Sequence, residues 1–202
     1  MDFFETVRRR QSTRRFSDQP VAHEDILTML EAATLAPSAT NEQPWHFIVI
    51  RDKELKQGMR DVVKAVLEAS ISETDNQARR KRLARMRFYS THFAAAPVAI
   101  AVLARPWTGG SYGSRPDSTS HDLALQSIAM AVAQLLLAAT ALGYSSCFAS
   151  APVEFAREEL EALIGVEPPW FLVGTISLGM AVKQRQERAH RKALEEVCTF
   201  IG

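Results

Sequence analysis

Apolar and polar residues alternate along the first third of the chain with the spacing of helices. Residues 2–9 predict a short amphipathic helix, and residues 23–36 repeat apolar positions every three or four residues until Pro37 ends the pattern. The next apolar run, residues 47–50, is short and continuous, which predicts a buried strand. The first third of the chain is therefore expected to form two helices followed by a strand.

The remaining pattern mixes further helices and strands. The elements expected are a helical stretch over residues 53–87, strands at 96–104, 145–150 and 171–178, a long apolar helix at 121–144 with Gly143 at its C-cap, and an amphipathic helix at 154–164 followed by Gly165. Because these elements follow no regular β-α-β period, they favour an α+β fold over a doubly wound parallel sheet. No repeat or linker divides the chain, so residues 1–202 are expected to form a single domain.

Composition narrows the class of protein. The chain has 202 residues, a 47% hydrophobic share and a formal net charge of +1, so no strong overall field draws it to nucleic acid or membranes. Its two cysteines, Cys147 and Cys198, have no CxxC spacing, which favours a reducing compartment and a cytoplasmic location. Asp122 and Gln134 interrupt the apolar residues 121–144, so a core or dimer-interface helix is favoured there over a membrane span.

Most common catalytic signatures find no support in the sequence. The five histidines are scattered without metal-ligand spacing, and neither a GxSxG elbow nor a nucleotide-binding glycine motif is present. His46 is expected to be packed and hydrogen-bonded at a strand start, and Cys147 to be an inert buried thiol. The glycines within residues 109–113 predict a flexible loop. The basic run at residues 79–87 is interpreted first as a solvated helical face near a mobile lid.

Residues 8–16, RRRQSTRRF, place five arginines within eight positions. Arg10, Ser12 and Arg14 alternate, so in an extended segment their side chains point the same way. Guanidinium groups match phosphate geometry and a serine hydroxyl adds one more donor, which favours a site for a single phosphate. A solvated basic arm and a nucleic-acid contact are the alternatives. The low net charge and the lack of a known nucleic-acid fold signature weigh against the second of these.

A second polar cluster follows in PSATNEQPW, residues 37–45. Ser38, Asn41 and Gln43 supply a hydroxyl and two amides on a loop bounded by Pro37 and Pro44. Such groups suit an uncharged polar ring better than a phosphate. An Asx-type turn that only links helix to strand is the simpler interpretation of the same residues.

These stretches together, in this order, resemble the FMN-dependent nitroreductase family over nearly the whole chain. RRRQSTRRF is similar to the family's N-terminal Arg-rich motif, and the run ending in APSATNEQPWHF to its most diagnostic segment. AAPVAIAV, the helix ending in ALGY before SSCF, and GTISLGMA before RKALEEV are similar to further family segments. The chain departs from the pattern in LGMA and RKALEEV, which lack a frequent proline, and in SSCFAS, which lacks a frequent glycine. Residues 53–89 match no subgroup, so the substrate is not indicated.

The resemblance implies an α+β fold of the nitroreductase type, an α/β sandwich with a mostly antiparallel central sheet flanked by helices. It also implies a homodimer with FMN at the subunit interface, contacted by both subunits. The implied FMN contacts are Arg10, Gln11, Ser12 and Arg14 at the phosphate and ribityl chain, Arg191 and Lys192 from the C-terminal segment, Pro37, Ser38, Asn41 and Gln43 from the other subunit's loop, and the backbone of Ala149 and Ser150 at the isoalloxazine ring.

The activity implied by the resemblance is ping-pong hydride transfer. NAD(P)H reduces the flavin at N5 and leaves, and a nitroaromatic, quinone or related acceptor takes its place, with no catalytic side chain required. Two alternatives stay open. One is a specialised flavin reaction, such as dehalogenation, dehydrogenation or flavin breakdown, with residues 79–87 as a lid for an acidic substrate. The other is a non-catalytic protein that binds or stores FMN.

Overall fold

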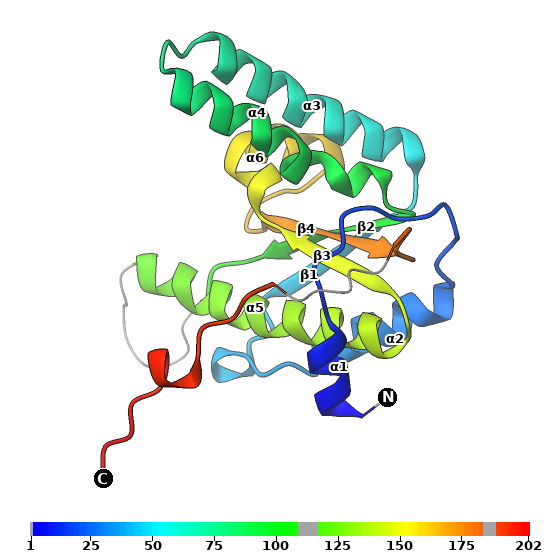
Figure 1. Cartoon of the computed structure of the whole chain (residues 1–202), viewed down its shortest axis with the longest axis vertical. Helices are drawn as coiled ribbons and strands as arrows, with labels where there is room; N and C mark the ends of the chain where they lie inside the picture. Colours follow the sequence, from blue (N-terminus) through cyan, green and yellow to red (C-terminus); the bar gives the residue numbers. More distant parts are fainter. Residues whose placement is uncertain (1, 109–116, 184–188) are drawn as a thin grey trace.

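A computed structural model describes residues 2–108, 117–183 and 189–202 of the chain (Figure 1). The predicted glycine loop at residues 109–113 lies outside these ranges. The elements in chain order are α1 Phe3–Arg9, α2 His23–Thr34, the 3₁₀ turn η1 Ala39–Asn41, β1 Trp45–Ile50, α3 Lys53–Ser72, α4 Gln77–Thr91, η2 His92–Ala95, β2 Val98–Ala104, α5 Asp117–Ala141, β3 Ser145–Ala149, α6 Ala151–Ile164, β4 Phe171–Gly179 and η3 Leu194–Glu196.

A four-stranded sheet in the order β1-β2-β4-β3 forms the centre of the molecule, and every strand pair in it is antiparallel. This confirms the α+β prediction and the mostly antiparallel sheet. All seven residues of β2 are buried, because β2 has a neighbour on each side and helices on both faces. β1 was expected to be a buried strand, but it lies at the edge of the sheet, and of its six residues three are only partly buried and one is exposed.

Two helical layers cover the two faces of the sheet (Figure 1). Alternate residues of β2 point to opposite faces, so Ile100 packs with α2 and α5 while Ala101 packs with α3, α4 and α6. The first core contains Met29 and Leu135 from its helices. The second contains Met59 and other apolar residues of α3, α4 and α6, which form the upper layer. The sheet thus separates two cores. Because alternate residues of a strand point to opposite faces, a residue's position in that alternation decides which core it enters.

The long apolar helix α5 is a core helix of this sandwich. Its residues 119–141 are long and apolar enough to cross a membrane by length and composition, and 39% of its most apolar window is buried inside the fold. Ile128, Leu135 and Ala139 of α5 contribute to the core below the sheet. Gly143 follows the helix with φ of +87°, as its predicted place at the helix end requires.

The helical stretch predicted for residues 53–87 is two antiparallel helices, α3 and α4, rather than one (Figure 1). Asn76 begins the second helix, because its side-chain oxygen accepts a hydrogen bond of 3.0 Å from the backbone N–H of Arg79. Asp52 starts the first helix in the same way through the N–H of Leu55. The two helices pack against each other and against α6, above the sheet.

Candidate functional site

The N-terminal basic segment lies extended beside the edge of the sheet. Ser12 forms a parallel bridge with Ser146 of β3, and the Thr13 N–H donates to the Ser146 carbonyl at 3.0 Å. Further along, the Ser17 N–H donates to the Met180 carbonyl at 2.8 Å, just beyond the end of β4. Such backbone bonds fix the extended conformation from which the alternation of Arg10, Ser12 and Arg14 was interpreted.

The alternating side chains all act on the thiol of one residue of β3, Cys147. Burial raises the pKa of the Cys147 thiol, while the charge of Arg14, a hydrogen bond with Ser12 and the charge of Arg10 act on it in the opposite direction. The three predicted phosphate-site residues therefore share one side of the segment. Gln11 lies between them and is half-buried. The expectation of a buried Cys147 is confirmed, since only 2% of its surface is exposed.

Among the described residues, no carboxylate neutralises the charge of Arg10 or Arg14. In the described part of the chain, the ion pairs of arginines join Arg9, Arg60, Arg87 and Arg105 to acidic partners, and neither Arg10 nor Arg14 takes part in one. The guanidinium of Arg14 instead lies over the ring of Tyr89 in α4, 5.2 Å from the ring centroid. Two half-buried cations beside a hydroxyl have the chemistry of an anion site.

His92 is a buried residue that the charge of Arg14 reaches, and sequence reasoning missed it. It is 5% exposed, and its Nδ1 shares a hydrogen bond of 2.9 Å with Ser177 Oγ of β4. Burial, assisted by the positive charge of Arg14, lowers the pKa of His92 to about 4. Ser177 pairs with Cys147 on the neighbouring strand β3. Arg14, His92, Cys147 and Ser177 therefore belong to one polar cluster. No local motif marks His92, because only the packing of η2 on the sheet buries it.

His46, by contrast, does not fit its prediction. It was expected to be packed and hydrogen-bonded, but it lies exposed on β1 and contacts the ring of Trp170 at a centroid distance of 5.5 Å. The cause is the edge position of β1, which leaves one side of the strand without a neighbour. Across the described ranges, no group of three His, Cys, Asp or Glu side chains could hold a metal ion.

The end of β3 and the start of α6 form the next wall of the candidate site. Ala149 pairs with Thr175, and Ser150 stands at the N-cap of α6, whose first turn receives no hydrogen bond from that side chain. Gly174 on β4 permits a close approach here. A Cβ on Gly174 would lie 2.6 Å from the ring of Phe148 and 2.8 Å from the Ala149 carbonyl oxygen.

The loop between Pro37 and Pro44 is an ordered turn. Ser38 Oγ accepts a hydrogen bond of 3.0 Å from the Gln43 N–H, as the simpler turn interpretation expects. Thr40, Asn41 and Gln43 have φ values of 52°, 55° and 51°, a conformation unusual for residues with a side chain. Asn41 and Gln43 are exposed, so their amides face outward.

Residues that follow β2 hold this loop through a network of contacts that the sequence did not reveal. The carboxylate of Glu42 pairs with Arg105 at 3.3 Å and accepts hydrogen bonds from the backbone N–H and the hydroxyl of Thr108. The indole N–H of Trp107 also donates to Thr40 Oγ1 at 3.0 Å. These contacts provide the support that three positive φ angles need, so the loop is preorganised.

One chain does not bring the predicted site residues into a single cluster. The loop of residues 37–44 precedes β1, at one edge of the sheet, whereas Arg10, Ser12 and Arg14 lie along β3, at the opposite edge. Three strand spacings of about 4.8 Å separate those edges. The C-terminal candidates have local contacts. Arg191 Nη1 donates to the carbonyls of Ala189 and His190 in its own segment, and Lys192 beside it is exposed.

The chain belongs to the nitroreductase family, whose sequence profile matches residues 7–180. A protein of Archaeoglobus fulgidus with the provisional name NADH dehydrogenase/NAD(P)H nitroreductase is 31% identical over 171 residues, covering 84% of this chain and 80% of the relative. The crystal structure of a BluB-like flavoprotein from Clostridium difficile 630 superposes with a TM-score of 0.87 at 29% identity, over 100% of both chains. An iodotyrosine deiodinase bound to FMN and 3-iodo-L-tyrosine superposes with a TM-score of 0.75 at 24% identity, covering 98% of this chain and 99% of that one.

Proposed function

We propose that the protein is an FMN-dependent oxidoreductase that takes electrons from NAD(P)H and passes them to a nitroaromatic, quinone or related small acceptor. The observation that carries this proposal is the pair of guanidinium groups, Arg10 and Arg14, that lie without a carboxylate partner among the described residues, on the extended segment in which Ser12 bridges to β3. A flavin phosphate is an anion, and its charge is opposite to that of these two groups. The names of the nitroreductase and flavoprotein relatives support the same conclusion.

The chain's own residues divide the work of binding. Arg10, Ser12 and Arg14 hold the phosphate, with Gln11 beside the ribityl chain, because charged donors to phosphate form short and strong hydrogen bonds. Ala149 and Ser150 present backbone groups to the ring, since β3 ends there and α6 begins. The bound flavin supplies the hydride chemistry. The protein supplies position and electrostatics, and no side chain is assigned as a nucleophile or a general base.

The site is completed by a second copy of the chain in this proposal. Pro37, Ser38, Asn41 and Gln43 lie at the sheet edge opposite to the arginines, so they reach the flavin of the partner subunit rather than their own. Arg191 and Lys192 join the phosphate from the exposed C-terminal segment. The protein is placed in the cytoplasm, where NAD(P)H is available and where two unpaired cysteines stay reduced.

The direct test is a visible absorption spectrum of the purified protein, with FMN added if none is bound, followed by NADH or NADPH without oxygen. Flavin bands that bleach on addition of the nicotinamide support the proposal. Flavin bands that persist contradict the choice of reductant while leaving the cofactor in place. A protein that takes up no FMN contradicts the whole proposal.

A specialised flavin reaction is the second candidate, because the chain also superposes over 98% of its length on an iodotyrosine deiodinase. Reductive dehalogenation of a bound aromatic ring would use the same cofactor site with a more selective cover. Release of iodide from 3-iodo-L-tyrosine under reducing conditions, faster than reduction of a nitroaromatic acceptor, favours this candidate. The reverse order of rates favours the general oxidoreductase.

A further inference from the structure

Helix α4 carries an unusual concentration of positive charge. Its cations are Arg79, Arg80, Lys81, Arg82, Arg85 and Arg87, and Gln77–Thr91 contains no acidic residue. Every one of these side chains is exposed. Like charges three or four positions apart on a helix repel each other by a few tenths of a kcal/mol per pair, so the row weakens the helix that bears it.

Two of these cations have structural partners on the side of α4 that faces the rest of the upper layer. Arg80 donates to the Thr74 carbonyl at 2.7 Å, and Arg87 pairs with Glu68 of α3 at 3.6 Å. Leu83, between them in sequence, enters the core above the sheet. Arg80 and Arg87 therefore have structural contacts, whereas Arg82 and Arg85 form no ion pair within the described part of the chain.

Arg82 and Arg85 lie instead on the side of α4 that meets the flavin site. Tyr89 marks that side, because its ring lies under the Arg14 guanidinium at 5.2 Å. Positions four and seven residues before Tyr89 fall on nearly the same helical face, and these positions are Arg85 and Arg82. At a rise of about 1.5 Å per residue, they extend the face by about 6 Å and about 10 Å from Tyr89. Two cations that form no ion pair among the described residues thus continue along α4 away from the proposed phosphate site.

We propose that Arg82 and Arg85 bind an anionic group, a carboxylate or a phosphate, of the small molecule that exchanges electrons at the flavin. This inference rests on the proposed function and narrows its substrate class. The anion has two possible sources, the electron acceptor and the nicotinamide reductant. Either molecule would react at the bound flavin, and Arg85 and Arg82 continue along α4 from Tyr89, which contacts Arg14. The carboxylate or phosphate then relieves the repulsion within the row, which gives binding a charge-dependent gain.

The acceptor arm of the test needs no turnover. FMN loading is first measured by absorbance for the wild type, for the Arg82→Gln/Arg85→Gln double variant and for Arg87→Gln. Each loaded, oxidised protein is then titrated by calorimetry with 4-nitrobenzoate and with its neutral analogue 4-nitrobenzamide. If the acceptor supplies the anion, the double variant binds 4-nitrobenzoate at least about tenfold more weakly, as expected for lost charged hydrogen bonds, and binds 4-nitrobenzamide unchanged.

The reductant arm compares kcat/KM for NADH and NADPH with that for 1-benzyl-1,4-dihydronicotinamide, which has no phosphate. If the reductant supplies the anion, kcat/KM of the double variant falls at least about tenfold for NADH and NADPH and is unchanged for 1-benzyl-1,4-dihydronicotinamide. Arg87→Gln is the matched control, because it removes the same charge from the opposite side of the same helix.

The outcomes separate this inference from the proposed function. The inference is supported if the double variant binds 4-nitrobenzoate more weakly, or has a lower kcat/KM for NADH and NADPH, and Arg87→Gln does not. Equal effects in the double variant and Arg87→Gln overturn it, since they show only the overall charge of α4. No effect in either arm overturns it as well. A wild-type protein that takes up no FMN overturns both the function and the inference, whereas a loaded protein without discrimination overturns the inference alone.

Discussion

Arg14 connects three parts of the molecule through one side chain. Its guanidinium lies over Tyr89 of α4, and its charge acts on His92 of η2 and on Cys147 of β3. It does so without a carboxylate partner among the described residues. Because these neighbours hold the Arg14 side chain in place before an anion binds, binding has to order this side chain only a little further. The entropic cost of binding is then small.

Arg14→Ala and Arg10→Ala are each expected to weaken FMN binding about tenfold or more, because each removes a charged phosphate donor worth about 1.5–3 kcal/mol. The affinity is measured by titrating FMN with apoprotein and following the loss of flavin fluorescence. Arg8→Ala is the control, since Arg8 is an exposed residue of the same basic run. Unchanged FMN affinity in both variants would refute the phosphate assignment.

His92 makes the stability of the protein depend on pH. Its pKa falls from 6.5 to about 4 on folding, so the folded protein excludes a proton that the unfolded chain binds. Stability is therefore lost as the pH falls below about 6.5, by about 2 kcal/mol between pH 7 and pH 5. In His92→Gln this loss should be absent, while a bond to Ser177 remains available.

Urea unfolding at pH 7 and pH 5 measures this contribution as the difference between wild type and His92→Gln. His23→Gln serves as the control, because His23 is exposed on α2. Other groups titrate equally in all three proteins and cancel in the comparison. The same loss of stability in wild type and His92→Gln would show that His92 is not the buried group responsible.

The sequence predicted the arrangement of some candidate site residues because that arrangement is local. Arg10, Ser12 and Arg14 share a side as soon as their segment is extended, and residues 12–17 pair with the sheet. His92 escaped prediction for the opposite reason. Its burial and its bond to Ser177 join positions 85 residues apart, which no spacing within η2 reveals. The same holds for Glu42, whose partners Arg105 and Thr108 follow β2.

At the scale of elements, apolar periodicity predicted where helices and strands lie in the sequence better than it predicted how deeply each one is buried. β4 was predicted at residues 171–178 and spans Phe171–Gly179. The break between α3 and α4 was missed, because Asn76 acts as a cap only through its bond to the Arg79 N–H. The exposure of β1 was missed too, since a continuous apolar run does not show whether a strand has one neighbour or two.

The end of β3 depends on a single glycine of β4. Gly174→Ala is expected to destabilise the protein by more than about 1 kcal/mol, because the new methyl group would overlap the Phe148 ring and the Ala149 carbonyl oxygen. The strand end that presents Ala149 and Ser150 would shift, so FMN affinity should fall as well. Chemical unfolding and FMN titration measure the two effects.

Gly58→Ala is the matched control for that substitution. Gly58 lies inside α3, where the nearest atom to a new Cβ is a side-chain methyl of Leu163 at 3.7 Å. There alanine should stabilise the helix by about 0.5–1 kcal/mol and leave FMN affinity unchanged. If the two variants behaved alike, close packing at Gly174 would not be the reason for its glycine.

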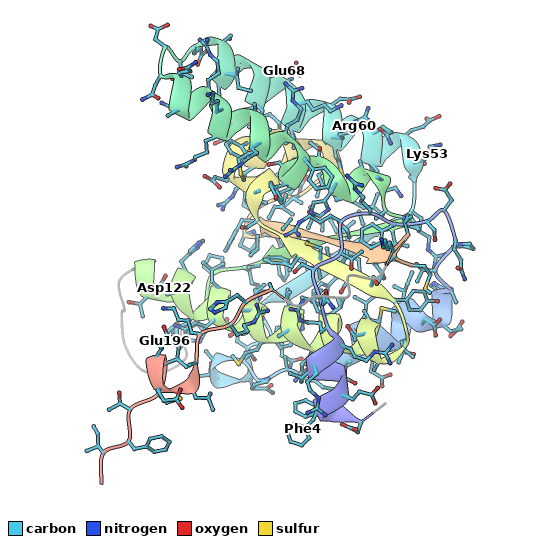
Figure 2. The ribbon with its side chains drawn as sticks, in the orientation of Figure 1. Phe4, Lys53, Arg60, Glu68, Asp122 and Glu196 are labelled. Atoms are coloured by element: carbon cyan, nitrogen blue, oxygen red, sulfur yellow. The ribbon has the colours of Figure 1, made fainter. Side chains whose placement is uncertain are left out.

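At the scale of the whole molecule, the chain exposes apolar side chains at both of its ends. Phe3 and Phe4 of α1 are 65% and 68% exposed, and Phe4 projects away from the rest of the fold (Figure 2). Phe200 and Ile201 in the C-terminal segment are 96% and 97% exposed. Two such surfaces, together with candidate site residues divided between opposite edges of the sheet, are what a second copy would cover in the proposed homodimer. Apolar periodicity could not predict this arrangement, and only the family resemblance implied it.

The last prediction follows from these exposed ends. In the proposed homodimer, each Phe or Ile side chain that the partner buries would contribute about 1.5–3 kcal/mol, and each subunit would contribute both Phe200 and Ile201. A Phe200→Ser/Ile201→Ser variant should therefore have the mass of a monomer at micromolar concentration, where the wild type has that of a dimer. Light scattering after size-exclusion chromatography measures the masses. Cys198→Ser, an exposed neighbour in the same segment, should remain a dimer.

The same variant tests whether the flavin site needs two subunits. If Asn41 and its loop complete the partner's site, the monomeric variant should also lose FMN, although Arg10, Ser12 and Arg14 are intact. A monomer that keeps wild-type FMN affinity would place the whole cofactor site within one chain and refute the division of the site between the two edges of the sheet. A wild type that is monomeric yet holds FMN would refute it without any substitution.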